Sequence, residues 1–313
     1  MRVESSAKHG CCPTKLGRCE NDSHYLYDVG VIRCLRVVCA AGLIGLGACS
    51  DEQSATDQPV VVVTYSALES IVADIVGDSA RVVVLIPNGT DPHDFEPSAK
   101  DVEALSQAAL VVSNGLDLEA GLGDALGEAE KSGVPVFHIA DHVTSRDGGD
   151  PHVWLDPLTL AEAVPALANE IGTRIGADLD SAGAAVVSSL GEVNTRIKER
   201  VAKLESCVVI TGHDSLGYFG ARYGCEIIGS IIPSFSTAAE ATAKDLSDLK
   251  AIAQAEGVKA IFTELGTPAD VANQLAAEVG VDVVEIATHL VPDGGGYDDM
   301  MFVLTDAIVD GLS

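Results

Sequence analysis

Three histidines lie in three separate loops, and each loop follows an apolar run of the chain. His93 lies in the segment DPHDFEPS, His152 in DPHVWLDP and His213 in TGHDS. One loop histidine alone is more typical of a surface or capping residue. Three in the same kind of loop favour a shared metal site. Neutral imidazoles suit tetrahedral Zn²⁺ with a fourth ligand, whereas a carboxylate-rich set would suit Mn²⁺ better.

Alternating strand and helix patterns precede and separate these loops. Short runs rich in Val and Ile indicate buried strands, with helical patterns near 68–76, 98–107 and 118–131 between them. The predicted strands of the first half are Val60–Thr64, Arg81–Ile86, Leu110–Ser113 and Val134–Ile139. This βαβ series predicts a mostly parallel sheet.

The same series recurs after about residue 205. Its predicted strands are Val208–Thr211, Glu226–Ile231, Ala260–Thr263 and Val281–Ile286. Its predicted helices are Ser215–Tyr223, Ala239–Glu256, Pro268–Val279 and Tyr297–Leu312. We therefore expect an α/β fold with two four-stranded, mostly parallel lobes.

One long amphipathic helix is predicted between the lobes. Its apolar residues recur every three or four positions from Leu179 to Leu204, over about seven turns. A stiff helical link predicts limited closure of the lobes. The predicted organisation is a leader and lipoprotein signal peptide at 1–48, a tether at 49–58, the first metal-binding lobe at 59–176, the linking helix at 177–204 and the second metal-binding lobe at 205–313.

The histidine loops should meet in a cleft between the lobes. Ligands of parallel α/β sheets gather beyond the carboxyl ends of the strands, and His93, His152 and His213 all follow predicted strands there. His289, after the last strand, is a minor further candidate. Asp156 has two equal interpretations, a carboxylate that holds a histidine ring or part of a helix-entry turn.

The N-terminal segment has the pattern of a targeting sequence. RCLR at 33–36 is a short basic region, 37–47 is apolar and small, and LGAC at 46–49 matches a bacterial lipobox whose Cys49 receives lipid. The apolar run is too short to span a membrane. Residues before about Val31 fit no signal pattern, so we expect an upstream start codon assigned in error, or else a disordered leader.

Two cysteines remain in the predicted folded part, Cys207 and Cys225. In an exported chain two cysteines indicate one disulfide, and the alternative is two buried free thiols. The whole chain carries a formal net charge of −28 with 4% aromatic residues. Such an acidic protein repels phosphate backbones, which argues against a nucleic-acid partner.

These motifs resemble those of a known family. The segments PHDFEPS, DPHVWLDP and HDSLGYF resemble the ligand-bearing segments of the TroA-like (ZnuA-like) zinc- and manganese-binding lipoproteins of bacterial ABC importers. The resemblance covers nearly the whole mature chain. It implies two lobes, a linking helix and delivery of metal to a permease. Manganese binders often have Glu in the third motif, where this chain has His213.

The sequence departs from the family in two places. The family commonly supplies an Asp ligand shortly before the final helix, but Gly295 falls at that place when Met300-Met301 is aligned. The fourth position is therefore left to Asp293, Glu264 or water, and Glu264 has the alternative interpretation of a supporting carboxylate. The acidic, histidine-rich loop of many zinc-binding relatives is also missing, since residues 141–149 contain only His142.

The leading interpretation is a non-catalytic protein that captures Zn²⁺, or less favourably Mn²⁺, outside the cytoplasmic membrane. It would be a monomer, anchored by lipid to the outer face of that membrane, and would pass metal to an ABC permease driven by its ATPase. One alternative is a zinc hydrolase with a three-histidine site, although the chain has neither an HExxH nor a GxSxG motif. Another is an adhesin-like surface lipoprotein.

Overall fold

The computed structural model describes residues 58–313. The predicted leader, the lipobox with Cys49 and nearly all of the tether at 49–58 lie outside this range. None of the helices within residues 58–313 has the length and hydrophobicity that a membrane span requires.

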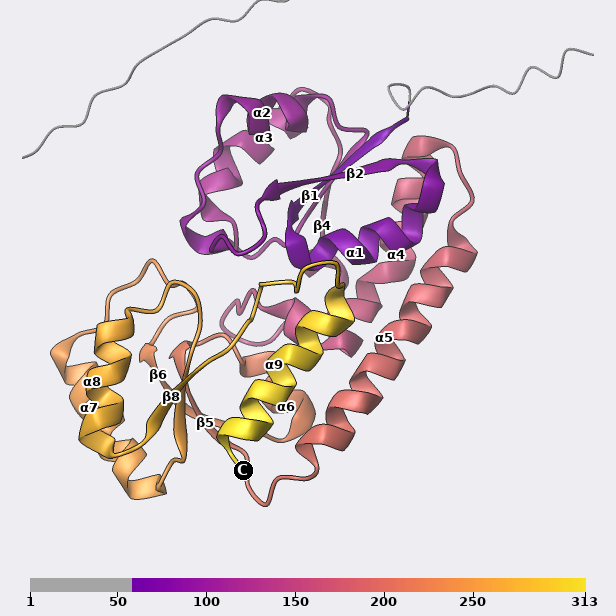
Figure 1. Ribbon diagram of the computed structural model, residues 1–313. Helices are drawn as coiled ribbons and strands as arrows, with labels where there is room; N and C mark the ends of the chain where they lie inside the picture. The colour runs from indigo at the N-terminus through magenta and orange to yellow at the C-terminus, as the bar shows by residue number, and fades with distance from the viewer. Residues whose placement is uncertain (1–57) are drawn as a thin grey trace, which may run out of the picture. The chain divides into compact units, whose positions relative to one another are not determined.

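The first lobe is built on a four-stranded parallel sheet with strand order β2-β1-β3-β4. Its central strand β1 is almost fully buried, as its run of valines predicts. In Figure 1, α1 lies on one side of this sheet and α2 and α3 lie on the other. The elements are β1 (Val60–Tyr65), α1 (Ser66–Val76), β2 (Arg81–Ile86), α2 (Ala99–Ser106), β3 (Leu110–Ser113), α3 (Gly123–Lys131) and β4 (Val136–His138).

Two long antiparallel helices follow, α4 (Pro157–Ile175) and α5 (Asp180–Val201). The apolar repeat predicted α5, whereas no bounds were predicted for α4. The two helices pack along each other. Their approach is close at Gly183, where a Cβ atom would lie 2.8 Å from the Cβ of Ala168. A side chain at Gly183 would push the helices apart, so this glycine allows their tight packing.

The second lobe contains four parallel strands, but they form two two-stranded ladders, β5-β6 and β7-β8. This differs from the single four-stranded sheet that we expected. β5 lies beside β7. At their carboxyl ends the backbone N–H groups of Gly212 and His213 donate to the carboxylate of Glu264, each at 3.2 Å, instead of to strand carbonyls. A side chain thus replaces part of the expected ladder.

The helices of the second lobe cover these strands, and the last one returns along α5. Its elements are β5 (Val208–His213), α6 (Gly217–Tyr223), β6 (Glu226–Ile232), α7 (Ala243–Glu256), β7 (Ala260–Thr263), α8 (Ala269–Val279), β8 (Asp282–Glu285) and α9 (Tyr297–Gly311). The helix predicted from Ala239 begins only at Ala243, because Thr242 and Asp245 form a capping box there. The helix predicted from Leu118 begins at Gly123, after two residues with positive φ, Leu116 and Asp117.

The larger core joins the two lobes. Its buried apolar side chains come from the first sheet, from α4, α5 and α9, and also from the second lobe, where Val209, Phe219 and Phe262 contribute. A smaller core lies within the second lobe and includes Ile210, Ile231 and Leu249. Because apolar packing continues across the lobes, large hinge motion would expose core surface and is opposed by the hydrophobic effect.

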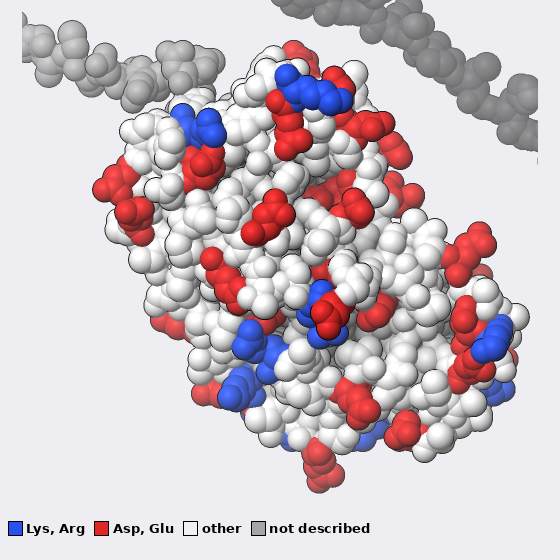
Figure 2. Space-filling model, turned by 180° about the vertical axis from the view of Figure 1, so that it is seen from behind, with Lys and Arg blue, Asp and Glu red and all other residues white. Residues whose placement is uncertain are grey.

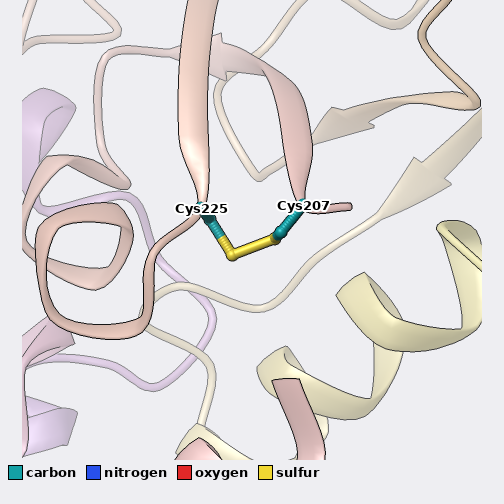
Figure 3. The surroundings of a disulfide bond; sticks show 2 residues. All are labelled: Cys207 and Cys225. Atoms are coloured by element: carbon teal, nitrogen blue, oxygen red, sulfur yellow. A yellow bond between two sulfur atoms is a disulfide. The ribbon is translucent and has the colours of Figure 1, made fainter. Parts of the chain in front are cut away.

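A disulfide links Cys207 and Cys225, which directly precede β5 and β6 (Figure 3). The predicted pair is therefore confirmed, and the alternative of two free thiols is wrong. The two cysteines are neighbours because Glu226 N–H donates to the carbonyl of Cys207 at 2.8 Å at the start of the β5-β6 ladder. The bridge fixes the amino ends of these strands, opposite to the edge that carries His213.

The acidic composition is visible on the surface. Figure 2 shows the back of the protein, where acidic side chains are spread over the face and basic ones are fewer and interspersed. This pattern fits a solvated, soluble surface, as the net charge of −28 predicts.

Candidate metal centre

The structure brings His93, His152 and His213 together from three loops. Each offers one nitrogen, and these three atoms all lie within 4.8 Å of one another. His93 lies in a short turn of 3₁₀ helix after β2, His152 directly precedes another, and His213 is the last residue of β5. The first two come from the first lobe and the third from the second. As predicted, the carboxyl ends of parallel strands place them at a common edge.

The His93 ring lies against the other two. Its centroid is 5.5 Å from that of His152 and 5.4 Å from that of His213, with edge-to-face geometry in both cases. Asp91 holds the turn, because its Oδ1 accepts a hydrogen bond from the backbone N–H of His93 at 3.0 Å. The other oxygen of Asp91 accepts from the hydroxyl of Thr237 at 2.6 Å, which ties this loop to the second lobe.

His152 is oriented by Asp150. The ring Nδ1 lies 2.8 Å from Asp150 Oδ1, which also accepts the backbone N–H of His152 at 3.1 Å. Both side chains are almost completely buried. Arg146 Nε lies 3.2 Å from the second oxygen of Asp150. Burial raises the pKa of Asp150 to about 6, although the His152 N–H and the Arg146 charge act in the opposite direction.

His213 is oriented by Glu264 in the same way. The ring Nδ1 lies 2.5 Å from Glu264 Oε1, and both groups are buried. The carboxylate also accepts from Ser215 Oγ at 2.9 Å and from the backbone N–H groups described above. Burial by itself would raise the pKa of Glu264, but the hydrogen bonds from His213 and Ser215 outweigh it and lower the pKa.

The Nε2 atoms of His152 and His213 face each other at 3.0 Å. Each ring has its Nδ1 beside a carboxylate, so the neutral tautomer with hydrogen on Nδ1 is favoured in both. Both Nε2 atoms then direct lone pairs at the same point, and these lone pairs repel each other. A proton or a metal cation between them removes this repulsion. Bonds of about 2.0–2.1 Å in a tetrahedral zinc site place two ligand nitrogens about 3.3 Å apart, close to the observed separation.

Burial keeps His93 and His152 neutral. Burial, as the largest cause, and the neighbouring His152 and His213 together lower the pKa of His93 to about 3, although Asp91 acts in the opposite direction. Burial also lowers the pKa of His152 well below its ordinary value, with the charge of His213 as the next cause. Neutral imidazole is the form that binds metals, so these two rings are ready to bind at neutral pH.

Asp156 has the helix-entry role of the two that we considered. Its Oδ1 accepts the backbone N–H of Leu158 at 3.0 Å, which caps α4, and its Oδ2 accepts Thr159 Oγ1 at 2.7 Å. Arg222 from α6 reaches both oxygens, with Nε at 2.9 and 2.8 Å. The residue that holds His152 is Asp150, which the sequence analysis missed. Its signal was present, since both DPH segments place Asp two residues before His.

The residues considered for the fourth position differ in their surroundings. Glu264 is engaged by His213, Ser215 and two backbone N–H groups, which is the supporting role that we considered for it. Asp293 is exposed in the loop before α9. His289, the minor candidate, is buried, and its Nδ1 lies 3.1 Å from Thr288 Oγ1. Burial lowers the pKa of His289 and thereby favours its neutral form.

The family described as "ZnuA: Zinc-uptake complex component A periplasmic" matches residues 61–311. This chain belongs to the ZnuA family. It is 28% identical over 296 residues to the manganese-binding lipoprotein MntA of Halalkalibacterium halodurans, with 88% of this chain and 97% of MntA covered. It is 26% identical to the metal ABC transporter substrate-binding lipoprotein SloC of Streptococcus mutans, with 89% of this chain and 98% of SloC covered.

The fold also matches a solved member of this group. The periplasmic zinc-binding protein TroA of Treponema pallidum superimposes with a TM-score of 0.73 at 26% identity, covering 82% of this chain and 99% of TroA. The predicted resemblance is thus confirmed. The ZnuA family comprises metal-binding proteins of ABC importers rather than enzymes, and it includes both zinc and manganese binders. Neither the hydrolase nor the adhesin-like alternative is favoured.

Proposed function

We propose that this ZnuA-family protein captures Zn²⁺ outside the cytoplasmic membrane through His93, His152 and His213 and passes it to the permease of an ABC importer. The opposed Nε2 atoms of His152 and His213, 3.0 Å apart, carry the proposal. With hydrogen on Nδ1 of both rings, beside the buried carboxylates, the facing Nε2 lone pairs repel each other unless a cation lies between them.

The donor set favours zinc over manganese. Three neutral imidazoles match the preference of Zn²⁺ for nitrogen ligands and tetrahedral geometry, whereas Mn²⁺ is better served by carboxylates. The two carboxylates that contact the imidazoles, Asp150 and Glu264, are both engaged by Nδ1 atoms and backbone N–H groups. They therefore act on the metal through the imidazoles.

The protein would bind the metal ion and release it to the permease, without catalysing a reaction. Lipid on Cys49 would keep the protein beside its permease, since an acyl anchor holds a protein at the membrane without spanning it. We further propose that the protein acts as a monomer, as the interlobe site is formed by one chain. Proximity to the permease raises the effective concentration for transfer, which helps a carrier that releases its ligand slowly.

Calorimetry on the purified protein and on H93A, H152A and H213A tests the site. The protein should bind one Zn²⁺, and each variant should lose more affinity than the about 10–100-fold that follows loss of an outer-shell partner. The matched control is H142A, because His142 is exposed and stacks on Phe137 away from the site. Unchanged affinity in any of the three variants would remove that histidine from the site.

Transfer and metal choice need separate measurements. Competition between Zn²⁺ and Mn²⁺ for the purified protein should favour zinc, and a preference for manganese would overturn the zinc assignment. In cells that lack the gene, the wild-type protein should restore growth under zinc limitation and H152A should not. Equal rescue by H152A, at equal protein levels, would contradict capture through this site.

A further inference from the structure

The loop between β6 and α7, residues 233–242, reaches the turn that carries His93. In this loop the hydroxyl of Thr237 donates to Asp91 Oδ2 at 2.6 Å, and both side chains are half-buried. The other oxygen of Asp91 accepts the backbone N–H of His93 at 3.0 Å. One carboxylate therefore connects the second lobe with the turn of a metal-binding histidine.

The β6–α7 loop is also anchored beside the loops of the other two histidines. The carbonyl of Ser234 accepts the backbone N–H of Asp214 at 2.9 Å, directly after the histidine that ends β5. A Cβ atom at Gly148 would lie 3.4 Å from the Phe235 ring, so this ring packs on the loop that leads to His152. The β6–α7 loop thus contacts all three of the loops that supply imidazoles.

The position of His93 depends on its backbone turn more than that of the other two histidines does. Asp150 lies beside the ring Nδ1 of His152, and Glu264 lies beside that of His213. Among the residues that the structure describes, nothing makes a hydrogen bond to His93 Nδ1. His93 is also half-buried, whereas the other two rings are almost completely buried. It is therefore the most accessible of the three and the one whose ring is held least directly.

The two DPH segments use their aspartates differently. In both, Oδ1 of the aspartate accepts the backbone N–H of the histidine two residues later. Asp150 Oδ1 also lies 2.8 Å from the ring of its own histidine. Asp91 instead uses its second oxygen for Thr237. The same local turn is thus tied to its own imidazole in one loop and to the opposite lobe in the other.

Gly266, in the loop after β7, leaves the space for this contact between the lobes. A Cβ atom there would overlap Asp91 Oδ2 and would lie 2.9 Å from the methyl group of Thr237. The φ of Gly266 is +90°, which glycine adopts at little cost. Both the backbone conformation and the close approach therefore favour glycine at this position.

We propose that Thr237 is a positioning residue that holds the His93 turn against the second lobe and thereby slows the release of bound metal. This inference rests on the proposed function. The Thr237–Asp91 hydrogen bond has an ionised acceptor, which makes it stronger than a bond between neutral groups. It must break before the turn can carry His93 away from the ion. Loss of the hydroxyl should therefore raise the rate constant of metal dissociation.

Zinc release from T237V and T237S tests the role of the hydroxyl. Valine has the shape of threonine without the hydroxyl, and serine keeps the hydroxyl. The matched control is T195V, because the exposed Thr195 donates to the Gly191 carbonyl within α5. Stopped-flow mixing of the zinc-loaded proteins with excess chromophoric chelator gives the dissociation rate constant. We expect T237V to release zinc about 10-fold faster than the wild type, the loss expected for one hydrogen bond to a charged acceptor, and T237S and T195V to stay close to the wild-type rate.

Asp91→Ser shows whether Thr237 acts through Asp91. The serine hydroxyl can still accept the His93 N–H, but it is too short to reach Thr237. In the D91S background, T237V should therefore cause no further acceleration of zinc release. Such non-additivity isolates the pairwise contact from any general effect on stability, and metal-free melting curves establish that each variant is folded at the assay temperature.

Each outcome bears on a different step. An unchanged release rate in T237V would overturn the proposal and leave the three-histidine site intact. Equal acceleration by T237V in the wild-type and D91S backgrounds would also overturn it, because Thr237 would then act apart from Asp91. A wild-type protein that binds no zinc would instead overturn the proposed function. Faster release in T237V, recovery in T237S and no further effect in D91S support the proposal.

Discussion

Glu264→Gln tests whether a buried carboxylate tunes the metal site through His213. In the wild type, Glu264 Oε1 lies 2.5 Å from His213 Nδ1 and also accepts from Ser215 Oγ and from the backbone N–H of His213. The amide oxygen of glutamine can take over these three contacts. The substitution therefore removes the charge while it preserves the shape.

The size of the effect follows from the contacts that change. A hydrogen bond to a charged acceptor contributes about 1.5–3 kcal/mol, against about 0.5–1.5 kcal/mol for a neutral one. Among the described residues, the second oxygen accepts only the Gly212 N–H, at 3.2 Å, and the glutamine NH₂ would face that donor unfavourably. Loss of the charge also makes His213 a weaker base toward metal. We expect zinc affinity to fall about 10–100-fold, equivalent to about 1.4–2.7 kcal/mol.

Competition with a chromophoric chelator measures this change, with stoichiometry followed by elemental analysis. E285Q is the matched control, because Glu285 is exposed at the end of β8 and carries the same substitution in the same lobe. E264Q should still bind one zinc. Unchanged affinity would refute the reasoning that the carboxylate acts through the imidazole, and complete loss of zinc from a folded protein would make Glu264 a direct ligand.

Three further predictions concern pH, the disulfide and closure. His93 binds a proton near pH 6.5 in the unfolded state and only near pH 3 in the folded state, so the stability that neutral His93 contributes to the metal-free protein is fully present above about pH 6.5. This contribution falls by about 1.4 kcal/mol per pH unit below it. Urea melts should show a smaller slope of unfolding free energy against pH for H93Q, and an equal slope would contradict this. The two bridged cysteines, Cys207 and Cys225, are 18 positions apart. Loss of their bridge in C207A/C225A should lower the free energy of unfolding by about 3 kcal/mol and Tm by roughly 6–12 °C. Two reactive thiols in the unfolded, unreduced wild-type protein would exclude the bridge. Zinc should change the radius of gyration only slightly in small-angle scattering, because α5 and the Ser66–His289 contact already join the lobes; a large decrease would refute the stiff link.

The sequence predicted the elements well where one physical signal dominated. The strand β2 at Arg81–Ile86 was predicted at its observed bounds because an unbroken run of Val, Leu and Ile favours a strand. The apolar residues that recur every three or four positions from Leu179 predicted α5, because this spacing forms one face of a helix. The predicted first residues of α3 and α7 were wrong, because local backbone conformation sets the start of α3 and a capping box sets that of α7.

The sequence also predicted which histidines lie near one another. Three loop histidines, each after a predicted strand of a parallel sheet, must lie at one edge of their sheets, and the structure brings them within 4.8 Å. The pairing of Cys207 with Cys225 was likewise predictable, because no other cysteine follows Cys49 in the chain.

The partners of these residues depend on how segments that are distant in the chain pack together. Glu264 and His213 are far apart in the chain, and their contact depends on β5 lying beside β7. Asp156 could equally have held a histidine, but the approach of α6 gives it Arg222 instead. His289 was one histidine among several until the fold buried its ring and left Nε2 unpaired within the described residues. Sequence patterns report local periodicity, whereas such contacts arise from the packing of distant segments.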